Sequence, residues 1–421
     1  MLRPCLFLLL AALLVPNLPS NNRAAAEQPG PQYLLFQILV GGPEPPRGIF
    51  RRFLPKEGMQ RIARYIADTI RPPRSDPNRL LGFSVGPITM DEGEDDARSV
   101  IRDAFDVALA TDMAVAVHLD DYMFWGQARW PDGRLLREIE GTSEWADALG
   151  TPAPGLDIGW LPGVKLAPQM CYENPQVKDF VTYWTRDVVG SEVKKQVDRL
   201  VEAGKPHLFA GVIVGWESNL AHGYCSLSYL GYSADKPPGD FDRERERVLQ
   251  RHIERFAKGV YDAGIPRDMI FTHPGPISKR GYDDLLERVG REKVREMDQS
   301  TALRAFWTAF NNYSNPGFSG YLDERRFEDI YEAVQAHGRG SWAMTEGTNG
   351  TPMQGGWTRS ALSWETYLAR NFNHGTKLVN LFAGFQGPTQ EGATSPTESK
   401  EALAAYRKFL RGDRLVEGGT Q

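Results

Sequence analysis

Short apolar segments alternate along the chain with longer segments in which apolar residues recur at every third or fourth position. The short segments are rich in Val, Ile, Leu and aromatic residues, which is typical of strands buried on both faces. The longer ones carry their charges on one face, as in residues 95–105, where the i, i+3, i+4, i+7 spacing predicts an amphipathic helix. This alternation is typical of βαβ units and predicts a parallel sheet.

Seven predicted strands have clear limits, at 33–40, 80–85, 113–119, 208–214, 269–273, 341–345 and 377–382. The sixth strand in chain order is either 303–310 or 317–321, since both segments qualify. The helices predicted between the strands include 58–70, 94–111, 179–203, 242–263 and 324–337. Eight parallel strands with intervening helices in one chain predict an α/β fold, the (β/α)8 or TIM barrel. A doubly wound sheet is the alternative, but no glycine-rich phosphate-binding turn follows the first strand.

Two long irregular segments interrupt the alternation, at 120–175 after the third strand and at 215–240 after the fourth. Loops of this length are commonly binding walls or lids, and in a barrel the loops after the strands surround the active site. The two loops could instead simply cap the barrel.

Composition excludes several classes of protein. Hydrophobic residues make up 41% of the 421 residues and charged residues 24%, which is typical of a folded globular protein and not of a disordered or fibrous one. The net charge of -5 gives no electrostatic reason to expect nucleic acid as a partner.

The first residues are expected to be a secretory signal peptide. Residues 1–26 have a basic start, an apolar run too short to span a bilayer, and a terminal Ala-Ala-Ala. The mature chain, 27–421, would then be one exported barrel, secreted or periplasmic, without a membrane-spanning segment. It would keep two cysteines, Cys171 and Cys225, which either form a disulfide or remain two separate buried thiols.

Two glutamates stand at the ends of two predicted strands. Glu217 follows the fourth strand and Glu346 directly follows the seventh. Strands four and seven lie across a barrel from each other, so both carboxylates are expected at one site on its carboxyl-terminal face. Glycoside hydrolysis uses such a pair, in which one carboxylic acid protonates the leaving oxygen and the other carboxylate attacks the anomeric carbon or activates a water. For either glutamate alone, a salt-bridged rim residue is the alternative.

Residues 345–347 read Thr-Glu-Gly, and residues 215–219 read Gly-Trp-Glu-Ser-Asn. These two segments resemble the nucleophile and acid/base segments of the large clan of retaining (β/α)8 glycoside hydrolases, whose catalytic glutamates end strands seven and four. The resemblance covers the mature chain at the level of architecture. It implies that Glu217 is the general acid/base and that Glu346 is the nucleophile.

The chain departs from the clan at one position. The clan usually has Asn directly before the strand-four glutamate, where it holds the sugar 2-hydroxyl, and this chain has Trp216. Asn219 or Asn311 would then make that contact. The separation of the two carboxyl groups, about 5–5.5 Å for retention and about 6.5–9.5 Å for inversion, decides the stereochemistry and is left open by the sequence.

Polar and aromatic residues near the strand ends are candidates for sugar binding. Carboxylates and imidazoles hydrogen-bond to vicinal hydroxyls, and the flat C–H faces of sugar rings stack on indole. The candidate substrate-binding residues are His118, Asp120, Asp121, Trp125, Trp216, Asn219, His273, Asn311, Trp342 and Trp357. Each tryptophan could instead belong to the core, and His273 could instead be a structural histidine.

Two other functions remain as alternatives. A metal-dependent barrel hydrolase would require ligands such as His118, Asp120 and His273 to converge on an ion, although the first strand lacks a histidine pair and the chain has only 7 His. A non-catalytic carbohydrate-binding barrel would bind sugar without turnover. Serine chemistry is disfavoured because no Gly-x-Ser-x-Gly elbow lies between a strand and a helix, and no nucleotide-binding motif supports cofactor chemistry.

The sequence therefore predicts an exported glycoside hydrolase that cleaves β-linked oligosaccharides or glycoconjugates by a two-glutamate, retaining mechanism. The expected partner is a carbohydrate substrate, and no metal or organic cofactor is expected. The sugar, the linkage, exo or endo action and the oligomeric state are left open.

Overall fold

The computed structural model describes residues 30–40, 43–44, 49–50, 54–156, 165–275, 283, 286–287, 290, 305–320, 324–353, 356–359, 362–382 and 398–418. Apart from Gly30, they belong to one unit, Pro31–Gln421. The signal peptide predicted at 1–26 lies outside the described residues. Among the helices that are described, none is both long and apolar enough to cross a membrane.

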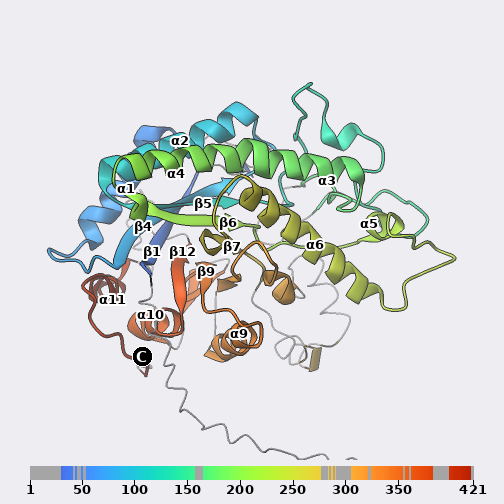
Figure 1. Cartoon of the computed structure of the whole chain (residues 1–421). Helices are drawn as coiled ribbons and strands as arrows, with labels where there is room; N and C mark the ends of the chain where they lie inside the picture. Colours follow the sequence, from blue (N-terminus) through green and yellow to red (C-terminus); the bar gives the residue numbers. More distant parts are fainter. Residues whose placement is uncertain are drawn as a thin grey trace, which may run out of the picture. The chain divides into compact units, whose positions relative to one another are not determined.

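Eight parallel strands form one sheet in the order β7-β6-β5-β4-β1-β12-β9-β8. In chain order they are β1 (Gln32–Leu39), β4 (Arg79–Ile88), β5 (Ala114–Leu119), β6 (Phe209–Val214), β7 (Ile270–Thr272), β8 (Gly317–Gly320), β9 (Trp342–Gly347) and β12 (Thr376–Leu381). The two outermost strands also meet, because Asn315, just before β8, bridges Phe271 of β7 and donates its N–H to the Ile270 carbonyl at 2.9 Å. The sheet therefore closes into the predicted (β/α)8 barrel (Figure 1).

Of the two candidates for the sixth strand, the later one is the strand. β8 covers Gly317–Gly320, whereas Ala305–Ala309 form a 3-10 turn beside helix α6 (Phe241–Asp262). Gly317 explains the choice, since a Cβ at this position would lie 2.3 Å from the Thr272 carbonyl oxygen of β7. Only a glycine lets the two strands approach this closely, and no periodicity in the sequence reports that requirement.

Helices cover the outer side of the barrel strands (Figure 1). Besides α6 they are α1 (Lys56–Ile70), α2 (Glu94–Thr111), α3 (Pro175–Thr182), α4 (Ser191–Glu202), α9 (Glu324–Ala336), α10 (Trp364–Phe372) and α11 (Lys400–Leu410). The short helix α5 (Tyr224–Ser228) lies in the segment between β6 and α6. The first-turn N–H groups of α3, α6, α10 and α11 bond to a side chain just before the helix, in turn Asn174, Asp240, Ser363 and Ser399. Two small hairpins, β2–β3 (Pro43–Glu44 and Ile49–Phe50) and β10–β11 (Gly350–Met353 and Gly356–Arg359), follow β1 and β9.

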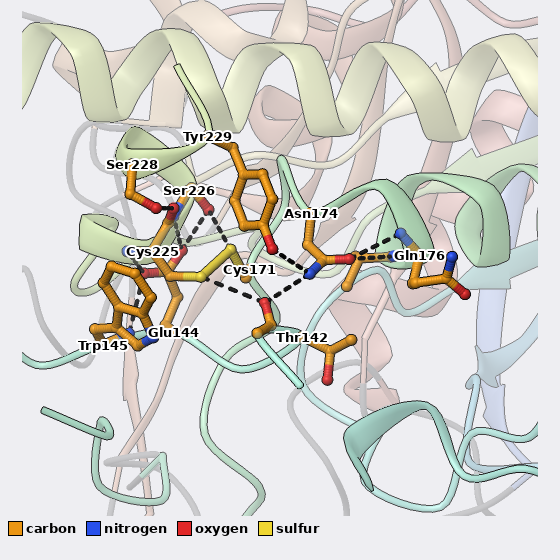
Figure 2. Close-up of a disulfide and its surroundings, with 12 residues drawn as sticks. Thr142, Glu144, Trp145, Cys171, Asn174, Gln176, Cys225, Ser226, Ser228 and Tyr229 are labelled. Atoms are coloured by element: carbon orange, nitrogen blue, oxygen red, sulfur yellow. Dashed lines mark hydrogen bonds between the residues drawn. A yellow bond between two sulfur atoms is a disulfide. The ribbon is translucent and has the colours of Figure 1, made fainter. Parts of the chain in front are cut away.

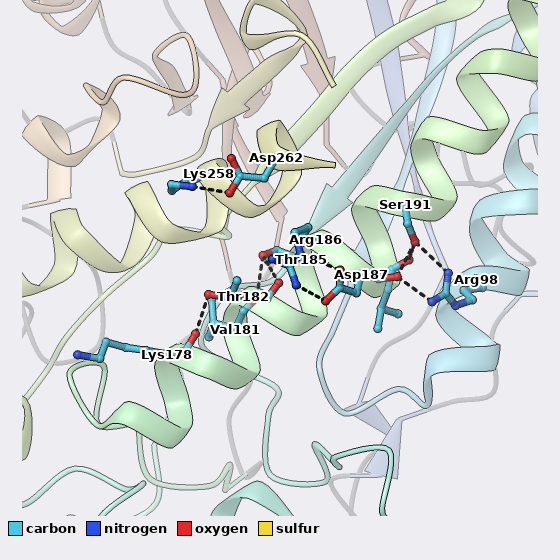
Figure 3. A network of polar contacts seen from close by, with 11 residues as sticks. Arg98, Lys178, Val181, Thr182, Thr185, Arg186, Asp187, Ser191, Lys258 and Asp262 are labelled. Atoms are coloured by element: carbon cyan, nitrogen blue, oxygen red, sulfur yellow. Dashed lines mark hydrogen bonds and ion pairs between the residues drawn. The ribbon is translucent and has the colours of Figure 1, made fainter. Parts of the chain in front are cut away.

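A π-helical segment, η2 (Tyr183–Gly190), joins α3 to α4, where the sequence predicts one regular helix. η2 packs closely on α6, because a Cβ at Gly259 would lie only 1.8 Å from the Thr185 hydroxyl oxygen. On the other side, Arg98 of α2 donates to the Asp187 carbonyl at 2.7 Å (Figure 3). The wider turn is thus held between two neighbouring helices, which hydrophobic periodicity alone does not reveal.

The inner face of the barrel changes from apolar to polar toward the carboxyl ends of the strands. Side chains two residues apart share a face of a strand. The inner apolar cluster consists of Tyr33, Leu35, Ala114, Ala116, Ala210, Ile213, Phe271, Ala343 and Leu378. Two residues further along the same columns come Gln37 on β1, His118 on β5 and Asn380 on β12, all buried. The polar layer lies at the end of the barrel where an active site is expected.

The two long loops after β5 and β6 are joined covalently. Cys171 of the first loop and Cys225 of the second form a disulfide, with their Cα atoms 5.6 Å apart (Figure 2). Close by, the buried Glu144 carboxylate accepts hydrogen bonds from the backbone N–H groups of Cys225 at 3.0 Å and Ser226 at 3.1 Å. Both loops start at the carboxyl ends of their strands, so this pairing constrains the wall of the site.

Candidate active site

Glu217 stands three residues after β6 with a left-handed backbone conformation, φ 52°. This conformation is uncommon outside glycine and costs on the order of 1 kcal/mol or more, so the surrounding contacts must hold it. The Glu217 N–H donates to the His273 carbonyl at 2.9 Å. That bond ties the segment after β6 to the segment after β7.

The Glu217 carboxyl group is placed by strand β8. Its Oε1 accepts a hydrogen bond from the Ser319 hydroxyl at 2.8 Å, and its side chain remains partly exposed. Burial raises the pKa of Glu217, and the Ser319 hydrogen bond opposes that rise because it stabilises the carboxylate. A carboxyl with a raised pKa suits proton donation near neutral pH.

Glu346 lies within β9 and is only 3% exposed. In the β8–β9 pairing its Cα partner is Ser319, the same residue that bonds to Glu217. Ser319 on β8 therefore bonds to one glutamate and lies beside the other on the neighbouring strand. Ser319 is a site residue that was not predicted from the sequence, because one serine in a short glycine-rich strand does not indicate a functional role.

Two histidines stack beside the glutamates. The rings of His118 and His273 have centroids 4.7 Å apart and planes 19° apart, and both side chains are fully buried. Burial lowers the pKa of His118 to about 4 and that of His273 well below the usual range, so both imidazoles are neutral at pH 7. A ring nitrogen of each lies within 4.8 Å of a carboxylate oxygen of Glu346. These three side chains could hold a metal ion, and Glu346 stands where the sequence-based metal alternative had Asp120.

Asp120 and Asp121 are fully buried and bond to backbone groups of the loops. The Asp120 carboxylate accepts three N–H groups from the residues that follow it, at 2.7 to 3.2 Å. Asp121 Oδ1 accepts the Trp216 N–H at 3.1 Å, and its carbonyl accepts His252 Nε2 at 2.9 Å. Burial raises the pKa of Asp120 to about 7 and that of Asp121 to about 6. Both lie beside the site, and Asp121 fixes the segment that carries Glu217.

Two further predicted residues lie on this same segment. The Trp216 ring is tilted against His118, with centroids 6.1 Å apart, and is largely buried. Asn219 is held through its carbonyl, which accepts the Tyr172 hydroxyl at 2.8 Å. Tyr172 adjoins the disulfide residue Cys171, so the two joined loops also fix the position of Asn219.

Other predicted residues are placed elsewhere. Trp125 is fully buried and its indole N–H donates to the Pro168 carbonyl at 2.9 Å. Trp342 is the first residue of β9, at the end of the strand away from Glu346, and it donates to the His374 carbonyl.

Asn311 precedes β8, and its side-chain oxygen caps the turn at 313–314. Trp357 lies on β11, and its side chain is outside the described residues.

A network of buried polar side chains inside the barrel was not predicted from the sequence. Asn380 donates to Gln37 Oε1 at 3.1 Å and to the Thr345 carbonyl at 2.8 Å, and accepts the Ser84 hydroxyl at 2.8 Å. Gln37 Nε2 is buried without a hydrogen-bond partner. A single polar residue on the inward face of an apolar strand was the signal that could have identified Gln37 and Asn380.

No protein-family model matches the chain, and no curated protein matches it. Among solved structures, it is similar to the α-N-acetylgalactosaminidase NagBb quadruple mutant from Bifidobacterium bifidum at 9% identity, over 60% of this chain and 36% of that one, with a TM-score of 0.30. This chain thus spans about a third of that protein's length. The GH26 β-mannanase BoMan26A from Bacteroides ovatus matches at 11% identity, over 92% of both chains, with a TM-score of 0.34. A sugar phosphate isomerase/epimerase from Parabacteroides distasonis ATCC 8503 matches at 9% identity, over 93% of this chain and 100% of that one, with a TM-score of 0.36. Similarities this weak carry no argument about activity.

Proposed function

We propose that the protein is a glycoside hydrolase that uses Glu217 as general acid/base and Glu346 as nucleophile. The observation that carries the proposal is the position of Ser319, which bonds to the Glu217 carboxyl and pairs in register with Glu346. Two carboxyl groups at one site can act together on one glycosidic bond. The raised pKa of Glu217 supports its role as the acid, because a carboxyl group must hold its proton in order to donate it.

In the proposed reaction, Glu346 attacks the anomeric carbon while Glu217 gives its proton to the departing oxygen. The glycosyl-enzyme ester removes the negative charge of Glu346, which lowers the pKa of Glu217. Glu217, now a carboxylate, takes a proton from the water that releases the sugar. Configuration at the anomeric carbon is retained after two displacements.

The neutral imidazoles and the polar layer supply hydrogen bonds for a sugar. His118 Nδ1, both ring nitrogens of His273 and Gln37 Nε2 are buried without hydrogen-bond partners, and sugar hydroxyls can both donate to and accept from such groups. The joined loops, with Trp216 beside them, favour a short β-linked oligosaccharide or a glycoconjugate over a long polymer. Export of the mature chain is part of the proposal and rests on residues 1–26 alone.

The test is a panel of nitrophenyl α- and β-glycosides of different sugars, assayed with protein dialysed against a chelator. We expect turnover of one β-glycoside, and proton NMR of the first product should show the β-anomer. A first product of α configuration would show that the enzyme inverts the anomeric carbon and does not retain its configuration. Activity that disappears on dialysis and returns with a metal ion would contradict the proposal. Sugar binding without turnover of any glycoside in the panel, or of the matching oligosaccharides, would also contradict it.

Ser319→Ala is expected to move the basic limb of the kcat/KM profile to higher pH. The Ser319 hydroxyl stabilises the carboxylate form of Glu217, so its removal leaves the pKa of Glu217 higher and keeps the acid protonated further into the alkaline range. A hydrogen bond to a charged group contributes about 1.5–3 kcal/mol, part of which the neutral acid also receives, so we expect a shift of about half to one pH unit.

The matched control is Ser191→Ala, which removes a hydroxyl from the start of α4, where it bonds to the Asp187 carbonyl (Figure 3). Its pH profile should coincide with that of the unmodified protein. A basic limb that stays in place in Ser319→Ala, or moves to lower pH, would show that Glu217 is not the group that titrates there.

A further inference from the structure

Three side chains with metal-binding donors meet inside the mouth of the barrel. They are His118 on β5, His273 just after β7 and Glu346 on β9, and one donor atom of each lies within 4.8 Å of the others. In the described part of the chain, no other group of three or more His, Cys, Asp or Glu side chains has this geometry. All three residues are buried.

The hydrogen bonds of His118 determine which nitrogen it offers. His118 Nε2 lies 3.0 Å from the Gly215 carbonyl oxygen. A carbonyl only accepts, so Nε2 carries the hydrogen and Nδ1 keeps its lone pair. Nδ1 is buried and has no hydrogen-bond partner. Histidines that bind metal ions commonly hold their other nitrogen in this way, on a backbone carbonyl.

His273 lacks partners on both sides of its ring. Its Nδ1 and Nε2 are buried and neither makes a hydrogen bond. A buried polar group without a partner costs free energy, about 1–3 kcal/mol, which a bound ligand can recover. His118 Nδ1 and one ring nitrogen of His273 are therefore two lone-pair donors beside the Glu346 carboxylate.

We propose that His118, His273 and Glu346 form a binding site for a divalent transition-metal ion of the zinc type, and that the bound ion inhibits the enzyme. Two imidazoles and one carboxylate suit zinc, and hard ions such as Mg²⁺ prefer oxygen ligands. Tetrahedral bonds of about 2.0–2.1 Å place ligand atoms about 3.3 Å apart and lie in the plane of each imidazole. The side chains therefore draw together on binding, and the two stacked rings turn so that both lone pairs point at the ion, which leaves a fourth position for water.

The inhibitory effect rests on the proposed function, in which Glu346 is the nucleophile. An ion that coordinates the Glu346 carboxylate withdraws the electron pair that would attack the anomeric carbon. It also occupies the space between the two imidazoles and the carboxylate, so substrate and ion exclude each other. Inhibition should therefore be competitive and reversed by a chelator.

The test begins with binding, which does not depend on activity. Chelator-dialysed full-length mature protein is titrated with Co²⁺, whose visible absorption reports tetrahedral coordination, and with Zn²⁺ by calorimetry. We expect one ion per chain. His273→Gln and His118→Gln should each weaken binding by about 100-fold or more, because loss of a ligand exceeds the 10- to 100-fold effect of losing a supporting contact. His207→Gln, an exposed histidine before β6, is the control and should bind as the unmodified protein does. Circular dichroism checks the fold of each variant.

The activity assay then separates the two proposals. Zn²⁺ should inhibit the dialysed enzyme competitively, Mg²⁺ should not, and a chelator should restore the rate. Absence of stoichiometric binding, or binding that both His118→Gln and His273→Gln retain, overturns the metal site and leaves the glycosidase proposal standing. Dialysed protein that is inactive and becomes active with Zn²⁺ overturns the inhibitory role and the metal-free mechanism together.

Discussion

Glu346→Gln is expected to lower kcat/KM on the best aryl glycoside by about 10³- to 10⁵-fold, or ~4–7 kcal/mol of transition-state stabilisation. The amide has the shape of the carboxyl group but cannot form the glycosyl ester, so the first displacement has no nucleophile. Although Glu346 is buried within β9, glutamine has nearly the same shape, so the change should leave the barrel folded. The measurement is the steady-state rate of nitrophenol release, with thermal unfolding as the check on stability.

Glu192→Gln is the matched control, because Glu192 is also a buried glutamate but lies on α4, outside the barrel. It should keep activity close to that of the unmodified protein. Glu346→Ala opens a space at the nucleophile position, where added azide can attack the anomeric carbon directly and release the leaving group. The glycosyl azide should then have the anomeric configuration opposite to that of the substrate. Near-normal turnover by Glu346→Gln would remove Glu346 from the nucleophile role.

Glu217→Gln is expected to have effects that depend on the leaving group. General acid catalysis contributes about 10²- to 10⁴-fold, and it matters only where the departing oxygen needs a proton. Unactivated oligosaccharides should lose about that much in kcat/KM, whereas a dinitrophenyl glycoside should lose little in the first step. The second step lacks its base, so the glycosyl-enzyme should accumulate and appear in the intact protein mass as one added sugar.

Two further results follow from the same role. The basic limb of the pH profile should disappear in Glu217→Gln, because the group that loses its proton there has been removed. Azide should restore turnover of the dinitrophenyl substrate and give a product of unchanged configuration, since it attacks the glycosyl ester. Equal losses on activated and unactivated substrates would mean that Glu217 holds the substrate or the loop and does not transfer the proton. Circular dichroism is needed here, because Glu217 has an unusual backbone conformation.

The hydrogen bonds of Asp121 connect it to the segment that carries Glu217. Its carboxylate accepts the Trp216 N–H, and its carbonyl accepts from the buried His252. A buried carboxylate next to a strand end looks the same in sequence whether it faces a ligand or a backbone N–H.

Much of the fold was determined by the sequence alone. The alternation of short apolar strands with amphipathic helices predicts the (β/α)8 barrel, because strands buried on both faces and helices buried on one face leave different periodicities. The same pattern puts Glu217 and Glu346 at the ends of strands four and seven, and the topology brings those ends to one face. The sequence left two candidates for the sixth strand. The close approach of Gly317 to Thr272 requires a glycine, and hydrophobic periodicity does not reveal such a requirement.

Only the tertiary structure decided which polar residues share the site. Ser319, Gln37 and Asn380 come from strands far apart in the chain, and their hydrogen bonds exist only when the barrel closes. The stacking of His118 on His273 is equally non-local. Conversely, Trp342 matched the expected residue type but lies at the opposite end of its strand from Glu346. Local periodicity reports which face of an element is buried, whereas a site depends on distances between elements, and those are set by the packing of the whole barrel.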